Sequence, residues 1–310
     1  MSGSKKILIT GANGLLGQKV TEMFANETEH LLVLTDLAEK GEDTHEFEYF
    51  PMDITKKESV KESVRRHLPD IIINTAAYTN VDGCETEREL SWKVNVDSVK
   101  NFIIASRVNN SKIIHISTDY VFDGFATVPY IENNPINPLS VYGASKLKGE
   151  ELAIENNPAS IIIRTSWVYS SFGNNVVKTM LRLMKERDSI NVVEDQIGRP
   201  TYAAELANAI MTIISKGFKI TKQLRQQGDN PSTIYNYSNS GEPISWYQFA
   251  LAIKELSGVN CIVNPIPTSQ YPTPAKRPQY SVLDIAKIKQ HFPVRTSEWK
   301  ESLHKCLLLL

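Results

Sequence analysis

The sequence predicts an α/β fold, in which a doubly wound parallel sheet is followed by a smaller C-terminal lobe. Two observations support this prediction. Short apolar runs alternate with helix-like stretches through the first half of the chain, which is typical of parallel strands covered on both faces. The first of these runs also leads through glycines directly into a helix-like stretch. After about Arg164 the alternation ends, so we expect a first domain at residues 1–165, joined by a helix and a strand from later segments, and a substrate-binding lobe mainly at residues 166–310.

The expected elements of the first domain follow from the spacing of apolar residues. Short runs rich in β-branched residues predict strands, at residues 7–10, 31–35, 47–50, 71–73, 112–117 and 161–163. Apolar residues at helical spacing predict helices between them, at residues 15–24, 56–68, 90–108 and 142–156. This alternation predicts that the strands pair in parallel.

The second lobe is expected to be less regular. Helical periodicity is visible at residues 172–187, 203–216 and 246–257. Prolines are frequent in a later stretch, at Pro265, Pro267, Pro272, Pro274 and Pro278. Because proline disrupts regular helix and sheet, we expect loops there. The polar residues 224–232 are expected to form a mobile surface loop.

The composition excludes several classes of protein. With 34 basic and 35 acidic residues the net charge is −1, so no basic excess indicates a nucleic-acid partner. Cys84, Cys261 and Cys306 are scattered and form no C-x-x-C motif, so neither a disulfide framework nor a zinc site is indicated. The N-terminus has no apolar signal sequence, and no apolar run is long enough to span a membrane. We therefore expect a cytoplasmic protein with no membrane partner.

The glycine-rich segment after the first strand is a candidate nucleotide site. Gly11, Gly14 and Gly17 follow a G-x-x-G-x-x-G spacing, which differs from the G-x-G-x-x-G of most dinucleotide folds. A turn of this kind presents backbone N–H groups and a positive helix end to a diphosphate; the alternative is that the glycines only tighten packing. We expect dinucleotide contacts from Gly11, Asn13, Gly14, Leu15, Leu16 and Gly17.

Two acidic residues follow the next strands. Asp36 lies about 20 residues beyond the glycines, where a carboxylate can accept hydrogen bonds from the adenosine ribose. It would also repel the 2′-phosphate of NADP, so it favours NADH over NADPH, unless it is only a loop cap. Asp53, with Ile54, could place a carboxylate near the adenine, or could be a plain turn residue.

The segment after the fourth strand contains small side chains that would let its backbone approach a cofactor. We expect Ala76, Ala77 and Tyr78 to contact the cofactor, although ordinary strand-to-loop packing would also explain them. Asn95, in the next helix, could brace the site or only satisfy buried backbone groups.

Polar residues follow the fifth strand, where ligands of open α/β sheets bind. Thr118 is placed to hydrogen-bond a reacting oxygen, and Asp119 and Tyr120 can face a sugar. Each of them alone could also be structural.

Tyr142 and Lys146 lie four residues apart, on one face of a helix. The Lys146 ammonium is expected to favour the phenolate and to lower the pKa of Tyr142 from about 10. Tyr142 would then give a proton to a carbonyl oxygen as a hydride arrives, and Lys146 could hold the nicotinamide ribose. Together with the glycine turn, this pair predicts proton-coupled hydride transfer.

Seven segments carry a resemblance to a known family. They are GANGLLG at 11–17, NTAAYTNVDGCE at 74–85, STDYVFDG at 117–124, YGASKLKGE at 142–150, RTSWVY at 164–169, DQIGRPT at 195–201 and YPTPAKRPQYSVLD at 271–284. Through them the chain resembles, almost end to end, the extended short-chain dehydrogenases and, within these, the dTDP-4-dehydrorhamnose reductases of the RmlD type.

The resemblance implies a Rossmann-like fold and a specific reaction. The family reduces the 4-keto group of dTDP-6-deoxy-L-lyxo-4-hexulose to give dTDP-L-rhamnose, with NADH or NADPH. By position, Thr118, Tyr142 and Lys146 would be catalytic. The residues matching the sugar pocket are Val81, Asp119, Tyr120 and Trp167, and Arg277 could face the diphosphate. Some members of the family bind magnesium through glutamates at a dimer contact, so a homodimer is compatible with the resemblance. The corresponding glutamates cannot be assigned in this sequence, and we predict no metal.

Two other hypotheses for the function stay open at this point. The regulatory β subunit of methionine adenosyltransferase shares the fold and much of the pattern but acts as a binding partner, and regulatory relatives can retain the Tyr/Lys pair. A nucleotide-sugar epimerase or dehydratase is the other alternative. Dehydratases usually have an Asp-Glu pair after the catalytic Thr, whereas Thr118 is followed here by Asp119 and Tyr120.

Overall fold

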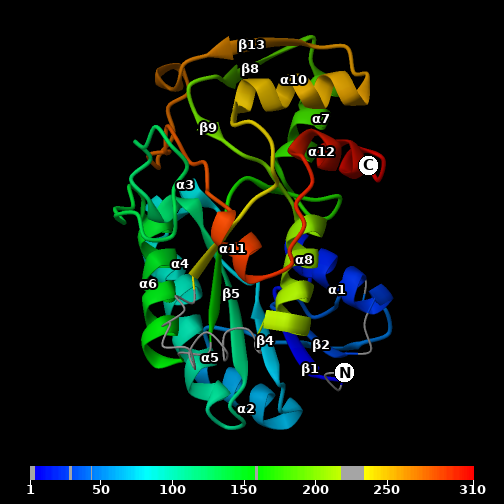
Figure 1. Ribbon diagram of the computed structural model, residues 1–310, viewed down its shortest axis with the longest axis vertical. Helices are drawn as coiled ribbons and strands as arrows, with labels where there is room; N and C mark the ends of the chain where they lie inside the picture. The colour runs from blue at the N-terminus through cyan, green and yellow to red at the C-terminus, as the bar shows by residue number, and fades with distance from the viewer. Residues whose placement is uncertain (1–3, 28–29, 43, 158–159, 218–233) are drawn as a thin grey trace.

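The computed structural model describes residues 4–27, 30–42, 44–157, 160–217 and 234–310. A parallel sheet with helices on both faces forms the lower body in Figure 1, and a smaller lobe lies above it. The surface loop expected at residues 224–232 lies outside the described residues.

The main sheet has seven strands, and each pair of neighbours is parallel. In spatial order they are β11 (Ile234–Tyr237), β6 (Ile161–Thr165), β5 (Lys112–Thr118), β4 (Ile71–Asn74), β1 (Lys6–Thr10), β2 (Leu31–Asp36) and β3 (Glu48–Pro51). The order 3-2-1-4-5-6 is that of the Rossmann fold, with its switch point between β1 and β4. The predicted doubly wound parallel sheet is therefore confirmed, extended by a seventh strand from late in the chain.

The two faces of the sheet pack against different helices, because successive strand residues point to opposite sides. Ile7 and Ile9 of β1 contribute to one core, and Leu8 contributes to the other. The first core is covered by α1 (Leu15–Glu27), α8 (Ala203–Thr212) and α11 (Ala286–His291). The second core is covered by α2 (Lys57–His67), α5 (Ser98–Ser106) and α6 (Val141–Asn156). Burial on both faces explains why strands such as β4 consist mostly of apolar residues.

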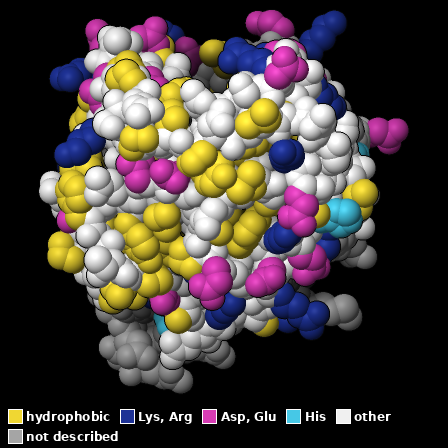
Figure 2. All heavy atoms as spheres, turned by 90° about the horizontal axis from the view of Figure 1, so that it is seen from above, with side chains coloured by type: hydrophobic (Ala, Val, Ile, Leu, Met, Phe, Trp, Pro, Cys, Tyr) yellow, Lys and Arg dark blue, Asp and Glu magenta, His cyan; other side chains and the backbone are white. Residues whose placement is uncertain are grey.

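The smaller lobe has its own core. Its helices are α7 (Val176–Glu186), α10 (Trp246–Ser257) and α12 (Trp299–Leu307). Its strands form three short pairs, β7 (Val168–Tyr169) with β10 (Thr201–Tyr202), β9 (Ile197–Gly198) with β12 (Ile244–Ser245), and β8 (Ser189–Val193) with β13 (Ile262–Ile266). Tyr169, Phe249 and Leu303 are fully buried at the centre of this core. On the face seen from above, acidic and basic side chains are mixed around groups of apolar ones (Figure 2).

The long helix expected at residues 90–108 is divided into three parts. It consists of α4 (Arg88–Trp92), a π-helical turn (Lys93–Asp97) and α5, and the short α3 (Val81–Thr86) precedes it. A π-helical turn inside a helix often marks a functional site. Here the turn carries Asn95.

Two expectations for the second lobe were wrong in detail. The proline-rich stretch was expected to contain no strand, but Pro265 lies in β13, opposite Val192 of β8. Proline can occupy this position because a two-stranded sheet consists of edge strands, where not every N–H has to be bonded. Helix α7 begins at Val176 rather than at residue 172, because the Asn175 side chain caps it by accepting hydrogen bonds from two backbone N–H groups.

No helix in the described part of the chain combines the length and the apolarity needed to cross a membrane.

Candidate active site

The predicted site residues gather at one edge of the sheet. The glycine turn follows β1, Asp36 ends β2, Thr118 ends β5 and Trp167 follows β6. Because the strands are parallel, their carboxyl ends meet at the same edge. This is the edge at which open α/β sheets bind ligands.

The glycine turn is packed too tightly for other residues. Gly11 has a φ of +70°, and a Cβ there would lie 2.7 Å from the backbone N of Ala76. A Cβ on Gly17 would lie 2.1 Å from the carbonyl oxygen of Gly11. The turn therefore closes on itself and against the segment after β4, as the glycines of a dinucleotide turn do. Gly14, Leu15 and Leu16 continue it into α1.

Asp36 braces this turn from the end of β2. Its Oδ2 accepts a hydrogen bond from the backbone N of Asn13 at 3.0 Å, and its Oδ1 accepts one from the N of Leu37 at 2.7 Å. The Asn13 side chain in turn donates to the carbonyl oxygen of Lys40. The structure thus brings Asp36 and Asn13 together, while their contacts with a cofactor stay a prediction.

Asp53 makes a local turn. Its Oδ1 accepts hydrogen bonds from the backbone N and the hydroxyl of Thr55, at 2.9 and 2.6 Å. The carbonyl oxygen of Ile54 accepts one from the Asn101 side chain at 3.0 Å. These contacts account for both residues structurally, and their proposed approach to the adenine stays a prediction.

Asn95 links the segment after β4 to α6. Its Oδ1 accepts from the N of Tyr78 at 2.9 Å, and its Nδ2 donates to the carbonyl oxygen of Tyr78 at 3.2 Å and to the hydroxyl of Ser145 at 2.9 Å. Ser145 lies between Tyr142 and Lys146 on α6 and donates to the carbonyl oxygen of Tyr142. These contacts satisfy the backbone of Tyr78 and tie it to α6, so they fit both expected roles of Asn95, and its contact with a cofactor stays a prediction. Ala76 and Ala77 lie in the segment that it holds.

Lys146 is buried beneath the sheet edge. Its Nζ donates to the carbonyl oxygen of Ile116 in β5 at 2.7 Å. Burial lowers the pKa of Lys146 to about 8, and Glu150 one turn further along α6 opposes this shift. The cation is thus held against a backbone carbonyl beside Thr118.

The expectation that Lys146 lowers the pKa of Tyr142 was wrong for this structure. Burial of the phenol raises the pKa of Tyr142 above its usual value and outweighs the opposing contact with the Thr118 hydroxyl. The nearby groups that act on it are Asp119, Tyr120 and Cys84, and these raise it further. Tyr142 is therefore a protonated phenol at neutral pH, which is the form that can donate a proton.

Thr118 and Asp119 form a buried pair at the end of β5. The Thr118 hydroxyl donates to Oδ1 of Asp119 at 3.0 Å and accepts a hydrogen bond from the N of Tyr120 at 3.2 Å. Burial raises the pKa of Asp119 to about 7, although hydrogen bonds from the side chains of Thr118 and Ser281 oppose the shift. Asp119 can therefore exchange a proton near neutral pH.

The residues expected to bind the sugar come from four separate elements. Tyr120 meets Tyr142 edge-on, with ring centroids 5.5 Å apart. Trp167 stacks on Trp246 at 3.4 Å, and it adopts a φ of +48° after β6. Val81 is the first residue of α3. The contact between Tyr120 and Tyr142 places the predicted sugar side of the site next to the predicted proton donor.

Two acidic residues of the segment at 74–85 were missed. Glu85 accepts a hydrogen bond from the N of Val141 at 2.8 Å and so holds the start of α6. Asp82 forms an ion pair with Arg277 at 2.6 Å. Their presence inside a family-typical segment was the available signal, but their partners lie 56 and 195 residues away.

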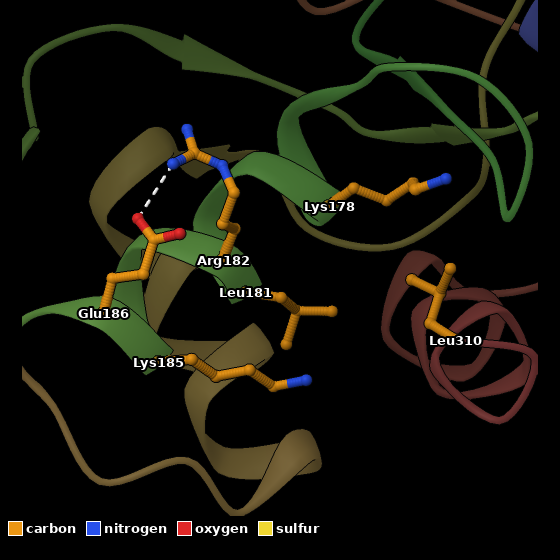
Figure 3. A pocket seen from close by; sticks show the side chains of 6 residues that line it. All are labelled: Lys178, Leu181, Arg182, Lys185, Glu186 and Leu310. Atoms are coloured by element: carbon orange, nitrogen blue, oxygen red, sulfur yellow. Dashed lines mark hydrogen bonds and ion pairs between the residues drawn. The ribbon is translucent and has the colours of Figure 1, made fainter.

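Two open cavities lie away from these residues. One, of about 350 Å³, is formed by α7 and the C-terminal residue Leu310, with Lys178, Arg182 and Lys185 around Leu181 (Figure 3). The other, of about 380 Å³, is lined by Arg199, Leu283 and Lys289 among others. Neither is lined by Thr118, Tyr142 or Lys146, so the chemistry of the side chains, rather than cavity size, identifies the candidate site. In the described residues no group of three or more His, Cys, Asp or Glu side chains is arranged to hold a metal ion.

Known proteins match this chain over nearly its full length. The family model described as "RmlD substrate binding domain" matches residues 5–310. A dTDP-4-dehydrorhamnose reductase from Aggregatibacter actinomycetemcomitans is 42% identical over 306 residues, covering 96% of this chain and 97% of the relative.

Solved structures agree with the sequence relatives. The crystal structure of a dTDP-4-dehydrorhamnose reductase from Clostridium acetobutylicum superposes with a TM-score of 0.85 at 37% identity, covering 98% of this chain and 99% of that one. The reductase from Bacillus anthracis, solved in complex with NADP, gives a TM-score of 0.84 at 34% identity and covers 99% and 100%.

Proposed function

The chain belongs to the RmlD substrate binding domain family, and from this premise we propose that it is an NAD(P)H-dependent dTDP-4-dehydrorhamnose reductase. The reaction is the reduction of the 4-keto group of dTDP-4-dehydro-6-deoxy-L-mannose to give dTDP-L-rhamnose. One structural observation supports this proposal most directly. The Tyr142 phenol lies beside the Thr118 hydroxyl, at the same sheet edge as the glycine turn.

The glycine turn fits a nicotinamide dinucleotide. A Cβ on Gly11 or Gly17 would collide with backbone atoms, so the chain can close tightly enough to point N–H groups at a diphosphate. The residues that would hold the dinucleotide are Gly11, Asn13, Gly14, Leu15, Leu16, Gly17, Asp36, Asp53, Ile54, Ala76, Ala77, Tyr78, Asn95, Tyr142 and Lys146. When bound, the reduced cofactor supplies the hydride.

The chain's own residues would handle the proton. Tyr142 donates its phenolic proton to the oxygen of the sugar carbonyl. The Thr118 hydroxyl would turn from Oδ1 of Asp119 to donate a hydrogen bond to the same oxygen. Lys146 is buried, and its Nζ is fixed by the carbonyl oxygen of Ile116. Lys146 is not among the groups that shift the pKa of Tyr142, so we assign its ammonium to holding the nicotinamide ribose.

The pocket beyond Tyr142 would hold the nucleotide sugar. Val81, Asp119, Tyr120 and Trp167 would contact the sugar ring, and Arg277 would face the diphosphate. In this proposal the lobe of residues 166–310 contributes Trp167 and Arg277, and the first domain contributes Val81, Asp119 and Tyr120. The three cysteines are free, which supports a reducing, cytoplasmic location. We also propose that two copies of the chain form a homodimer.

The direct test is an assay of cofactor oxidation. Purified protein is mixed with NADH or NADPH and the dTDP-4-keto-6-deoxy sugar, and the absorbance of the reduced nicotinamide is followed. Consumption of cofactor with formation of dTDP-L-rhamnose, identified by NMR, is the expected result. Cofactor binding without turnover on dTDP, UDP or GDP 4-keto sugars would instead favour a regulatory subunit.

A further inference from the structure

The segment that carries Arg277 is fixed from two sides. Asp82, in α3, binds it through both carboxylate oxygens: Oδ2 accepts from Arg277 at 2.6 Å, and Oδ1 accepts from the backbone N of Ala275 at 3.2 Å. On the other side Gly124 lies against Pro278, where a Cβ would come within 2.6 Å of the proline Cα. Asp82 therefore holds both the backbone and the charged group of this segment.

Arg277 also reaches the residues next to the proton donor. Its Nη1 donates to the hydroxyl of Tyr120 at 3.2 Å, and the Tyr120 ring meets the edge of Tyr142. Only one side chain separates the guanidinium from the predicted acid. The charge on Arg277 is thus held at the rim of the site rather than on a distant surface.

The Asp82–Arg277 pair is partly exposed to solvent. Arg277 is 25% and Asp82 is 34% exposed, and water weakens partly exposed ion pairs. A guanidinium has several N–H donors in a rigid fork, and the Asp82 and Tyr120 contacts leave some of them available for a further anion. The geometry therefore suits orientation of the cation more than stabilisation of the fold.

We propose that Asp82 is a positioning residue for phosphate recognition, which holds the Arg277 guanidinium beside Tyr120 so that its remaining donors bind the diphosphate of the nucleotide sugar. This inference rests on the proposed function. A long, flexible side chain that is already ordered loses less freedom when the ligand arrives. The nearby carboxylate also repels a diphosphate, but its charge is already paired with the Arg277 guanidinium.

Binding measurements on the full chain can separate this role from a structural one. Asp82→Asn keeps the acceptor for the N of Ala275 and removes the charge that orients Arg277. The dissociation constants of dTDP, thymidine and NADH are measured by calorimetry for wild type, Asp82→Asn, Arg277→Gln and the double variant. Glu255→Gln, which breaks the exposed pair with Lys300, is the matched control.

The expected result is a loss that is specific for the diphosphate. Asp82→Asn should weaken dTDP binding about tenfold, or ~1.4 kcal/mol, and leave thymidine and NADH unchanged. In the Arg277→Gln background the Asp82→Asn change should have no further effect, because Asp82 acts through Arg277. Glu255→Gln should match wild type for all three ligands.

Three outcomes would overturn the inference. These are unchanged or tighter dTDP binding by Asp82→Asn, an equal loss of thymidine binding, and a further loss in the double variant. Absence of dTDP binding by the wild type would be a different failure, because it would contradict the proposed function itself.

Discussion

The buried ion pair between α6 and β6 gives the sharpest prediction about stability. Arg164 in β6 and Glu150 in α6 are 0% and 1% exposed. Their guanidinium–carboxylate contacts measure 2.7, 3.0 and 3.2 Å, and Arg164 also donates to the carbonyl oxygen of Glu132 at 3.1 Å. We change Arg164 to Met, which keeps much of the apolar stem and removes the charge.

The size of the effect follows from the carboxylate that is left behind. Arg164→Met leaves Glu150 without its partner in the interior, and breaking a buried pair on one side typically costs about 3–5 kcal/mol. The double variant Arg164→Met, Glu150→Leu removes both charges and should recover most of this loss. Glu150 also raises the pKa of Lys146, so the pair lies close to the site as well as in the core.

Urea unfolding measures both changes, with an exposed pair of the same type as control. Arg182 and Glu186 of α7 form an ion pair at 2.8 Å but are 60% and 52% exposed (Figure 3). Arg182→Met should therefore cost no more than about 0.5 kcal/mol. The reasoning fails if Arg164→Met costs no more than Arg182→Met, or if the double variant is less stable than Arg164→Met alone.

Three further predictions concern catalysis. Tyr142→Phe should lose roughly 10²–10⁴-fold in kcat and keep its affinity for NADH, because it removes the proton donor; near-normal turnover would reject the assignment. NADH should bind more tightly than NADPH in fluorescence titrations, because Asp36 repels a 2′-phosphate, and a tenfold preference for NADPH would show that Asp36 does not face the ribose. The kcat for reduction should fall as the pH rises through about 8, because Lys146 loses its charge there while Tyr142, whose pKa is raised, stays protonated. In the Lys146→Arg variant, any remaining activity should not decline in this pH range. A decline at the same pH in that variant would show that another group is responsible.

Local sequence patterns were sufficient for six of the seven strands of the main sheet, whereas β11 was not located. Strands such as Ile71–Asn74 are buried on both faces, so their composition alone identifies them. The glycine spacing and the Tyr142/Lys146 pair are also local, and they identified the sheet edge at which the structure gathers the site. β13 was missed because Pro265 argues against a strand unless the strand is known to lie at an edge.

Features that depend on distant contacts could not be predicted. The partner of Asp82 lies 195 residues away, and nothing in the spacing of either residue connects them. The pKa of Tyr142 was misjudged because helical spacing places Lys146 nearby but does not reveal that its Nζ is bound by the carbonyl oxygen of Ile116. Nor does spacing reveal how far the phenol is removed from water, which decides the direction of the shift.

In the proposed reaction a hydride passes from the nicotinamide to C4 of a dTDP-linked sugar. The most direct test is a reaction with NADH carrying deuterium at the transferable position of C4, followed by NMR of the sugar product. The expected product is dTDP-L-rhamnose with deuterium at C4, with one cofactor oxidised for each product formed. Deuterium at another carbon, or intact labelled NADH after incubation with the substrate, would contradict it.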